Sequence, residues 1–292
     1  MKPPQFDYLR AATVSAALDA LSADPDAKLL AGGQSLVPLL NLRLARPSAI
    51  VDINGISELE RVTLDDGGAV RVGALVTHAR LVADPTIAAR MPLIAAAARL
   101  IGHVAIRNRG TVGGSLAHAD PTAELATAAL ALDADLRLAS PRGPRDVPVH
   151  TFFDSPFVTV LEPDEMLVEV RLPPRPSGEG WAFEEVAVRE GDFAIVAVAA
   201  LATLGGGVFR SVRIAWSGIG AIPASASRLA EALQGLEPGD PRVEASIADA
   251  ASRLEPPGDV RGSPDYRRHL ARVLTLRAVQ MAAARSAGGA RS

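Results

Sequence analysis

The chain has no cysteine among its 292 residues. This absence excludes disulfides, thiolate nucleophiles, and zinc or iron–sulfur centres held by cysteine within the chain. Histidine is also scarce: the five histidines are not paired at close spacing, so we expect no metal site built by the protein itself. Redox chemistry in this chain would therefore depend on an organic cofactor.

An excess of basic residues and a long hydrophobic run are missing as well. Thirty Lys and Arg against 33 Asp and Glu give a net charge of -3, so nucleic acid is not an expected partner. The longest apolar stretch, residues 195–204, is about half the length of a membrane span. The N-terminus lacks the charged-then-apolar pattern of a secretory signal. We therefore expect a soluble protein of the cytoplasm.

Prolines and glycines gather in one segment, residues 173–180, which holds three prolines and two glycines and is the best candidate for a domain boundary. Before it, short predicted strands alternate with helices. After it, three predicted strands (181–189, 194–204 and 208–216) precede three helices (225–233, 242–254 and 264–284), an order typical of an α+β domain. We expect an N-terminal domain over 1–176 with subdomains of about 1–56 and 57–176, a C-terminal domain over 177–286, and a disordered tail over 287–292.

Two glycine-rich loops stand out in the N-terminal domain. The first glycine loop, Ala31-Gly32-Gly33-Gln34-Ser35-Leu36, lies between a predicted strand and a predicted helix over 36–44. The second glycine loop, Thr111-Val112-Gly113-Gly114-Ser115, belongs to a segment, 106–120, that we interpret as a functional loop. Paired glycines let backbone N–H groups point together at an anion. Two such loops could bind the two phosphates of a dinucleotide.

Carboxylates follow the second glycine loop: Asp120 and Glu124 lie toward the two ends of a short segment that begins a predicted helix. They would suit the hydroxyls of a ribityl or ribose chain. Neither loop fits the G-x-G-x-x-G fingerprint or the G-x-x-x-x-G-K-[ST] phosphate loop, so a nicotinamide or ATP site of those types is not predicted. A single Gly-Gly pair is more often a plain turn; the two loops with their flanking residues are a more specific pattern.

Several segments together resemble a known family. They are residues 28–38 (KLLAGGQSLVP), 106–115 (IRNRGTVGGS), 119–121 (ADP) and 183–194 (FEEVAVREGDFA). Their order and spacing are similar to those of the FAD-binding medium subunit of molybdenum hydroxylases, which include aerobic carbon monoxide dehydrogenase and the xanthine dehydrogenase relatives. The resemblance covers nearly the whole chain and extends to its length.

The resemblance implies an α+β fold: a two-subdomain FAD-binding domain of the vanillyl-alcohol oxidase (PCMH) type, then a C-terminal domain of a three-stranded antiparallel sheet and a helical bundle. It implies FAD as the cofactor and no catalytic or metal-binding residue in this chain. The cofactor-binding residues that it implies are Ala31, Gly32, Gly33, Gln34, Ser35, Leu36, Ile101, Thr111, Gly113, Gly114, Ser115, Asp120, Glu124, Leu167 and Phe193. Among these, the two loops would surround the pyrophosphate, Ile101 would lie against a ring of the cofactor, and Phe193 would lie close to the isoalloxazine.

The resemblance also implies partners. Members of the family pass electrons from a molybdenum centre through two [2Fe-2S] clusters to FAD, and many bacterial members place each cofactor on its own chain. This chain would be the electron-transfer subunit, bound to a large molybdopterin-binding subunit and a small [2Fe-2S] subunit in a dimer of heterotrimers. The absence of cysteine agrees with this division, because the clusters must then lie on another chain.

Two positions depart from the family pattern. Val188 stands where many relatives have a second basic residue, and Glu184 stands where the eukaryotic xanthine enzymes have a lysine that reaches the flavin. Other residues have plainer interpretations: His118 is more often a structural hydrogen-bonding residue, and Arg107 could neutralise phosphate or pair at the surface.

Two other functions compete with this one. A self-sufficient FAD oxidoreductase of the vanillyl-alcohol oxidase type would need a substrate pocket over the flavin and usually a larger cap domain than the residues after Gly180 provide. A binding module that has lost the flavin is disfavoured by the two intact Gly-Gly loops.

Overall fold

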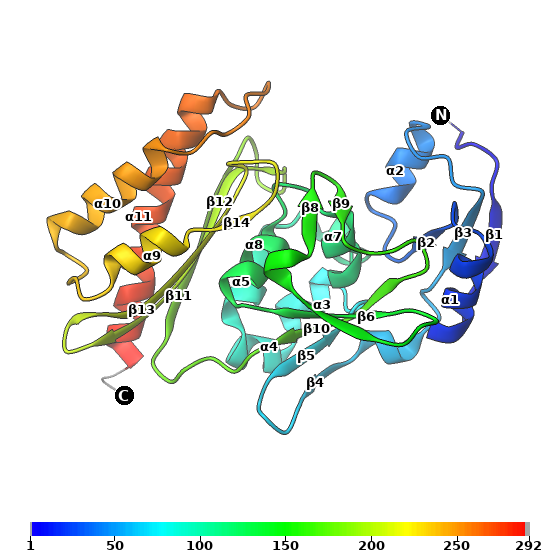
Figure 1. Ribbon diagram of the computed structural model, residues 1–292, viewed down its shortest axis with the longest axis horizontal. Helices are drawn as coiled ribbons and strands as arrows, with labels where there is room; N and C mark the ends of the chain where they lie inside the picture. The colour runs from blue at the N-terminus through cyan, green and yellow to red at the C-terminus, as the bar shows by residue number, and fades with distance from the viewer. Residues whose placement is uncertain (1, 290–292) are drawn as a thin grey trace.

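The computed structural model of the chain describes residues 2–289. Three larger sheets with their helices follow one another along the long axis of the molecule (Figure 1). The N-terminal sheet lies at one end, the sheet nearest the C-terminus lies at the other, and the third lies between them.

The N-terminal sheet is parallel, with the strand order β1-β3-β2. Its strands are β1 (Asp7–Arg10), β2 (Lys28–Leu30) and β3 (Ala49–Asp52). Because β3 is buried along its whole length, it lies at the centre of this small unit, as expected for a strand made only of apolar residues and a final aspartate.

Two helices accompany this sheet. Helix α1 (Val14–Ala23) begins after Thr13, whose side chain caps the helix by accepting a hydrogen bond from the amide of Ala16. Helix α2 (Leu36–Asn41) follows the first glycine loop. It ends before the predicted Leu44, because Arg43 takes a left-handed φ of 59°.

The middle sheet is antiparallel, with the strand order β4-β5-β10-β6-β7. Its strands are β4 (Val62–Leu64), β5 (Val70–Gly73), β6 (Asp135–Ala139), β7 (Arg145–Pro148) and β10 (Met166–Leu172). Two short 3-10 helices, η1 (Ser57–Glu60) and η2 (Val149–Thr151), and the hairpin of β8 (Phe153–Ser155) and β9 (Val158–Thr159) lie in the connections. Of these five strands β10 comes last in the chain, yet it pairs with both β5 and β6 and so lies at the centre of the sheet.

Six helices connect the strands of the middle sheet. They are α3 (His78–Ala83), α4 (Pro85–Arg90), α5 (Pro92–Leu100), α6 (Val104–Arg107), α7 (Val112–His118) and α8 (Glu124–Ala131). Every residue of α8 is buried, because this helix lies between the middle sheet and the C-terminal sheet (Figure 1). A helix buried on all sides, with apolar residues around most of its surface, is typical of a position inside a protein.

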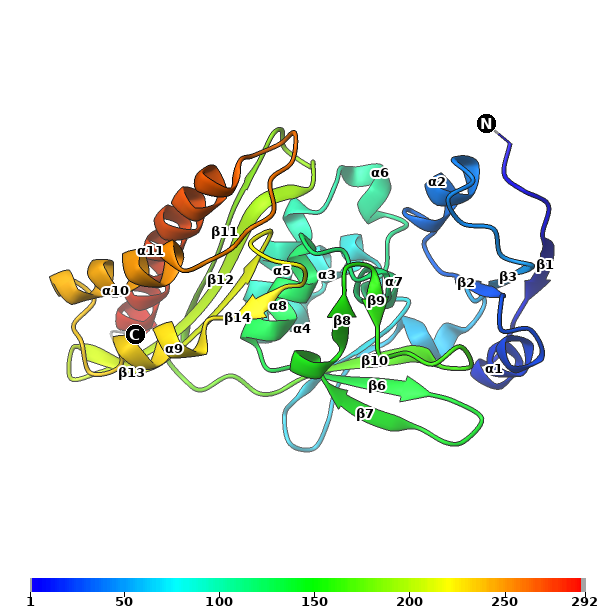
Figure 2. The same ribbon diagram turned by 45° about the horizontal axis from the view of Figure 1, so that its top comes forward.

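The C-terminal sheet is antiparallel, with the order β11-β12-β13-β14. Its strands are β11 (Gly180–Ala187), β12 (Ala194–Gly205), β13 (Val208–Ser217) and β14 (Ala224–Ser225). Helices α9 (Ser227–Leu233), α10 (Pro241–Ser252) and α11 (Pro264–Gly289) cover one face (Figure 2). The other face packs against α5 and α8 of the middle unit, so this sheet has apolar layers on both sides.

Three expectations from the sequence need correction. The C-terminal sheet has a fourth strand, β14, whose two residues are too short for a periodic pattern. Helix α11 continues to Gly289, so residues 287–289 of the expected disordered tail are helical, and residues 290–292 lie outside the described residues. The expected loop over 106–120 contains helix α7. Thr111 caps the N-terminus of this helix: its side chain accepts a hydrogen bond from the amide of Gly114 at 3.1 Å.

Within residues 2–289, no helix is long and apolar enough to cross a membrane.

Candidate cofactor site

The first glycine loop connects β2 to α2 in a tight turn. Gly33 has a φ of +72°, a conformation that residues with a side chain rarely adopt. The Gln34 side chain turns back on the loop, and its Nε2 donates a hydrogen bond to the carbonyl oxygen of Gly32 at 2.9 Å. Within residues 2–289, the amides of Gly33, Gln34 and Ser35 donate to no protein acceptor. These free N–H groups can bind an anion such as a phosphate.

Asn54, in the turn after β3, holds the first glycine loop. Its Nδ2 donates to the carbonyl oxygen of Ala31 at 2.9 Å and to that of Leu30 at 3.2 Å. The Asp52 carboxylate orients this amide, with 2.6 Å between Oδ1 and Nδ2, and also accepts a hydrogen bond from the Tyr8 hydroxyl at 2.5 Å. This group is not among the residues predicted from the sequence; its signal there is an Asp and an Asn, two residues apart, at the end of a buried strand.

The second glycine loop forms the N-terminus of α7 and is bound to the middle unit. The amide of Val112 donates to the carbonyl of Val76 at 3.0 Å, and the amide of Gly113 donates to that of Ala74 at 2.8 Å. With the Gly114 amide bonded to Thr111, this loop has fewer free donors than the first. It offers an exposed, side-chain-free surface at Gly114 and the hydroxyl of Ser115.

The two loops meet in space, although about 80 residues separate them. A Cβ atom added to Gly32 would lie 2.1 Å from the carbonyl oxygen of Arg109 and 2.8 Å from the Cα of Gly110. One added to Gly114 would lie 3.9 Å from the Cβ of Ala31. The structure therefore brings the two loops together at one place, and the glycine at position 32 is required for their contact.

Gly113 packs against Ala74, the residue after β5, and Ala74 is bonded to the central strand β10. An added Cβ would lie 2.5 Å from the Cβ of Ala74, so only glycine fits here. The Ala74 amide in turn donates to the carbonyl of Val168 at 2.9 Å, where β10 shifts its register beside Leu167. Leu167 itself is 5% exposed and lies in the strand that supports the second loop.

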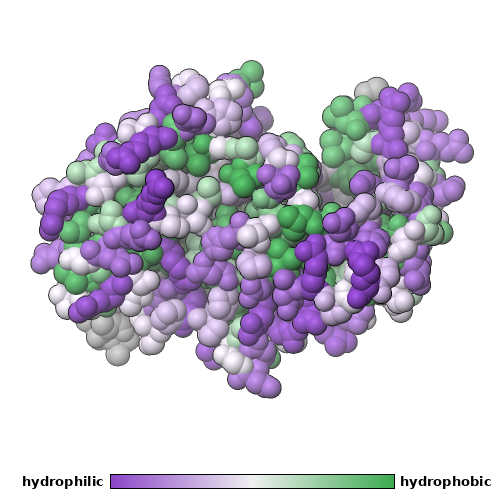
Figure 3. All heavy atoms as spheres, in the orientation of Figure 1, coloured by the Kyte–Doolittle hydropathy of each residue, from purple (hydrophilic) through white to green (hydrophobic). Residues whose placement is uncertain are grey.

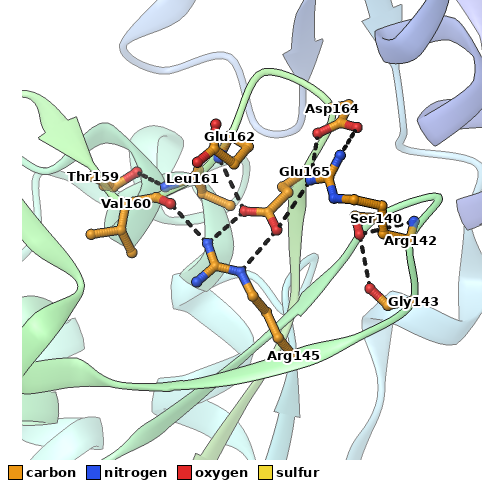
Figure 4. Close-up of polar contacts among 10 residues, drawn as sticks. All are labelled: Ser140, Arg142, Gly143, Arg145, Thr159, Val160, Leu161, Glu162, Asp164 and Glu165. Carbon is orange, nitrogen blue, oxygen red and sulfur yellow. Dashed lines mark hydrogen bonds and ion pairs between the residues drawn. The ribbon is translucent and has the colours of Figure 1, made fainter.

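A polar cluster fixes the segment that leads into β10 (Figure 4). The Glu165 side chain is 3% exposed and pairs with Arg145, with 2.6 Å between Oε2 and Nη2. The same carboxylate accepts a hydrogen bond from the amide of Glu162 at 3.0 Å, while Asp164 pairs with Arg142 on the outside. This cluster sets where β10 begins, just before Leu167.

The two predicted carboxylates follow α7 in different surroundings. Asp120 is partly exposed, and its Oδ1 accepts hydrogen bonds from the amide and the hydroxyl of Thr122 at 2.8 and 2.7 Å. Glu124, the first residue of α8, is 7% exposed. Burial raises the pKa of Glu124 to about 7, and the charge of Asp120 adds to the rise. A carboxyl group in this state can both donate and accept hydrogen bonds to hydroxyl groups at neutral pH.

Ile101 and Phe193 belong to segments that touch. An added Cβ on Gly191 would lie 2.8 Å from the carbonyl oxygen of Gly102, so the turn before Phe193 lies against the turn after Ile101. The Arg107 guanidinium donates to the carbonyl of Gly102 at 2.6 Å. Arg107 is therefore a structural cation in this turn. Phe193 is 57% exposed.

His78 is buried against the start of the second glycine loop. Its side chain is 4% exposed, and its Nε2 lies 3.0 Å from the carbonyl oxygen of Thr111. Burial lowers the pKa of His78 to about 4, so the ring is neutral at physiological pH. Its backbone amide also donates to the carbonyl of Gly110 at 2.9 Å.

His118 has a packing contact: its ring lies 5.2 Å from the ring of Phe157, centroid to centroid.

The surface beside the site is hollowed between the part that carries α2 and the rest of the molecule, with hydrophobic side chains on both sides of the hollow (Figure 3). Exposed apolar residues of the neighbouring segments include Val37 on α2 and Val104 on α6, which are 42% and 63% exposed. The free amides and the glycines suit the diphosphate of FAD. The buried carboxyl suits its ribityl hydroxyls, and the apolar residues suit its ring system. The residues present therefore fit this cofactor.

Comparison with known proteins agrees with this geometry. Residues 4–175 match the family described as the FAD binding domain in molybdopterin dehydrogenase. Residues 181–282 match the CO dehydrogenase flavoprotein C-terminal domain.

Individual relatives align over nearly their full length. The chain is 41% identical to the 6-hydroxypseudooxynicotine dehydrogenase complex subunit alpha of Paenarthrobacter nicotinovorans, over 97% of this chain and 96% of that protein. Its structure is similar to a chain of carbon monoxide dehydrogenase from Hydrogenophaga pseudoflava, with a TM-score of 0.94, 38% identity, and coverage of 98% and 99%. It is also similar to a chain of quinoline 2-oxidoreductase from Pseudomonas putida 86, with a TM-score of 0.92, 39% identity and the same coverage.

FAD is the cofactor of this fold, and the chain is an oxidoreductase subunit. Two matched domains, whole-length relatives and the meeting of the glycine loops lead to one conclusion: the chain belongs to the FAD-binding medium subunits of the molybdenum hydroxylases, of the carbon monoxide dehydrogenase and xanthine dehydrogenase type.

Proposed function

We propose that this chain is the electron-transfer subunit of a multi-subunit molybdenum hydroxylase. In this role it binds FAD, which receives electrons from the [2Fe-2S] clusters of a partner chain and passes them to an external acceptor. The observation that carries the proposal is the contact of Gly32 with the Arg109–Gly110 backbone, which joins the two glycine loops in one site within a chain that has no cysteine. FAD supplies the chemistry of accepting and releasing electrons, and the protein supplies its orientation and surroundings.

The chain's own residues would hold the cofactor from several sides. The amides of the first loop would bind phosphate oxygens, Gly114 and Ser115 would let the diphosphate approach α7, and Glu124 would bind the ribityl hydroxyls. Ile101 and Phe193 would lie against the ring system. The residues assigned to FAD are Ala31, Gly32, Gly33, Gln34, Ser35, Leu36, Ile101, Thr111, Gly113, Gly114, Ser115, Asp120, Glu124, Leu167 and Phe193. No general base for substrate oxidation is assigned to this chain.

Partners follow from the same assignment. We infer a large molybdopterin-binding subunit, where substrate is oxidised, and a small [2Fe-2S] subunit, assembled with this chain as a dimer of heterotrimers. Relatives named for carbon monoxide, quinoline and xanthine share this chain's sequence or fold at 33–39% identity. Because such different substrates go with one fold, we infer that a partner chain selects the substrate.

Purification under native conditions tests the proposal. We expect the chain to co-purify with a molybdenum-containing chain and a cysteine-rich iron–sulfur chain, with flavin absorbance, and to catalyse no substrate oxidation by itself. The decisive step is anaerobic reduction by substrate: flavin should be reduced only when all three chains are present. A yellow protein that oxidises a substrate alone would instead identify a self-sufficient oxidase and overturn the proposal.

A further inference from the structure

Phe193 lies between two fixed points of the main chain. On one side, the turn at Gly191 lies against Gly102 of the FAD-binding domain, since a Cβ added to Gly191 would be 2.8 Å from the Gly102 carbonyl oxygen. On the other side, the carbonyl of Ile195 accepts a hydrogen bond from the guanidinium of Arg267 on α11. The Phe193 side chain itself is 57% exposed, so the two flanking segments determine where it lies.

Arg267 is a cation in the interior of the C-terminal domain, and its side chain is 2% exposed. Its Nη1 donates hydrogen bonds to the carbonyl oxygens of Ile195 and Gly218, the latter at 3.0 Å. Its Nη2 lies 2.9 Å from Oδ1 of Asp259. One guanidinium therefore connects three segments: the start of β12, the residue after β13 and the loop between α10 and α11.

Gly218 lets two of these segments meet. It has a φ of +74°, and an added Cβ would lie 2.1 Å from the carbonyl oxygen of Ile195. At this end of the sheet, the pairing of β12 with β13 stops at Ala197 and Ser217. The Arg267 guanidinium thus bonds the two strands together beyond the point where their ladder ends.

Gly218 also reaches the FAD-binding domain. Its amide donates a hydrogen bond to the carbonyl of Pro121 at 3.1 Å. Pro121 follows Asp120, and three residues later Glu124 begins α8. Arg267 is therefore connected through Ile195 to the segment of Phe193, and through Gly218 to the segment that contains both predicted carboxylates.

Asp259 fixes the guanidinium from its third side. The loop that contains it lies at the end of the C-terminal sheet where β11 turns into β12 (Figure 2). Its Oδ1 also accepts hydrogen bonds from the amides of Arg261 and Gly262 at 2.9 and 3.0 Å. Burial acts to raise the pKa of Asp259, but the hydrogen bonds from Arg267 and Arg261 hold it at about 2. The carboxylate is ionised at neutral pH and stabilises the charge of Arg267.

The burial of this arginine favours a role in geometry. Taking a charge out of water costs free energy, and packed apolar residues in place of a buried ion pair often give equal or greater stability. Within the described residues the Nε of Arg267 is buried without a partner, so its hydrogen bonding is not complete. The bonds that it does form are directed at two carbonyl oxygens on either side of a domain contact.

We propose that Arg267 is a positioning residue of the flavin site, which acts through Ile195 and Gly218 to fix Phe193 relative to the segment 120–124. Helix α11, which has no residue assigned to FAD, thereby sets how the ring system is oriented against the rest of the cofactor site. This inference rests on the proposed assignment of Phe193 and Glu124 to FAD.

The test compares Arg267→Lys with the wild type in the full chain, reconstituted with FAD. Lysine keeps the charge but ends in a single ammonium, which cannot reproduce the planar fork that reaches Asp259 and both carbonyls. We expect the FAD dissociation constant to rise about tenfold, as for the loss of a hydrogen bond to a charged group. At saturating FAD, the visible circular dichroism of the flavin should weaken and its midpoint potential should shift. Hydrogen exchange should increase in residues 191–195.

Arg272→Lys is the matched control. Arg272 belongs to the same helix and pairs with Glu244 at 2.8 Å, but its side chain is 48% exposed. This variant should retain the wild-type FAD affinity, flavin circular dichroism and midpoint potential. Asp259→Asn is a second variant of the same contact, at a side chain that is 35% exposed; it should fold and change the three flavin signals in the same direction as Arg267→Lys, by a smaller amount.

The flavin signals separate positioning from simple stabilisation. If Arg267→Lys has the wild-type FAD affinity, circular dichroism and midpoint potential, whatever its melting temperature, the proposal is overturned; equal changes in Arg272→Lys overturn it as well. If Arg267→Lys does not fold, wild-type flavin signals in Asp259→Asn overturn it instead. Where Phe193→Ala changes these signals and the Arg267 and Asp259 variants do not, the proposed function stands and this inference fails. A folded wild-type chain that binds no FAD would overturn the proposed function itself.

Discussion

Gly32 lies directly against the main chain of Arg109: a Cβ atom at position 32 would be 2.1 Å from the carbonyl oxygen of Arg109. This contact joins the N-terminal unit to the middle unit where the two glycine loops meet. The free amides of Gly33, Gln34 and Ser35 follow on one side, and the exposed Gly114 lies on the other. A cofactor bound by both loops thus depends on a close approach of two backbones.

Gly32→Ala should therefore separate the two loops. Overpacking of this kind costs about 1–3 kcal/mol, and we expect FAD affinity to fall at least about tenfold. The measurement is flavin bound per chain after purification, followed by titration of the apoprotein with FAD. Gly239→Ala is the control, because an added Cβ at Gly239 meets no atom within 4 Å; equal flavin content in the two variants would show that the contact is not needed.

Asn54→Ala should loosen the first loop without touching the second. The variant loses the hydrogen bonds from Nδ2 to the carbonyl oxygens of Leu30 and Ala31. Removing one partner of a buried hydrogen bond costs about 1–3 kcal/mol, so we expect a lower melting temperature and weaker FAD binding. Hydrogen exchange should increase in residues 31–36 and stay unchanged in residues 111–115; increased exchange in both loops would mean that Asn54 acts on the whole domain.

Acid should destabilise the second loop through His78. The unfolded chain takes up a proton near the ordinary pKa of 6.5, whereas burial holds the folded-state pKa at about 4. Stability that is present above about pH 6.5 is therefore lost as the pH falls toward about 4, by an amount on the order of 3 kcal/mol.

His78→Gln keeps a donor for the Thr111 carbonyl and removes this titration. Its free energy of unfolding should depend less on pH between about pH 6.5 and about pH 4 than that of the wild type. His269→Gln, which changes an exposed histidine of α11, should retain the wild-type dependence. Chemical denaturation at several pH values measures the difference, and parallel curves for wild type and His78→Gln would refute the assignment.

Glu165→Ala should destabilise the middle sheet. The variant leaves Arg145 without the carboxylate that it contacts at 2.6 Å and the Glu162 amide without its acceptor. Breaking a buried pair by removing one partner costs about 3–5 kcal/mol; because Arg145 is partly exposed, we expect about 2–3 kcal/mol. Asp164→Ala, which removes the carboxylate of an outer ion pair with an exposed arginine, should cost less than about 1 kcal/mol. Equal losses in urea denaturation would show that burial of Glu165 is unimportant.

The local features of this protein follow from neighbouring residues. Thr13 caps α1, and the Pro-Gly segment 173–180 separates the regions that match two domain families. The family itself was recognisable from the order and spacing of residues 28–38, 106–115, 119–121 and 183–194, and the absence of cysteine agrees with it. These patterns span a few residues each, and the physical preferences behind them act over the same distance.

Other features appear only in the folded chain. The segment 106–120 resembles a loop in sequence because its glycines disfavour a helix, yet α7 forms there, with Gly113 packed directly against Ala74. The two-residue strand β14 exists only because β13 offers it an edge to pair with. Asn54 supports a loop more than 20 residues away, and no local pattern states that contact.

Sequence alone determined which groups the chain can bind. It has no thiolate to hold a metal cluster, and it has two glycine loops whose backbone can bind an anion. The tertiary structure decided that the two glycine loops meet at one site, and that Glu124 and His78 are buried. The reason is physical. Residue type fixes which groups are present, but burial and proximity arise only when segments distant in the chain pack together, and these two effects set the pKa and the partners of each group.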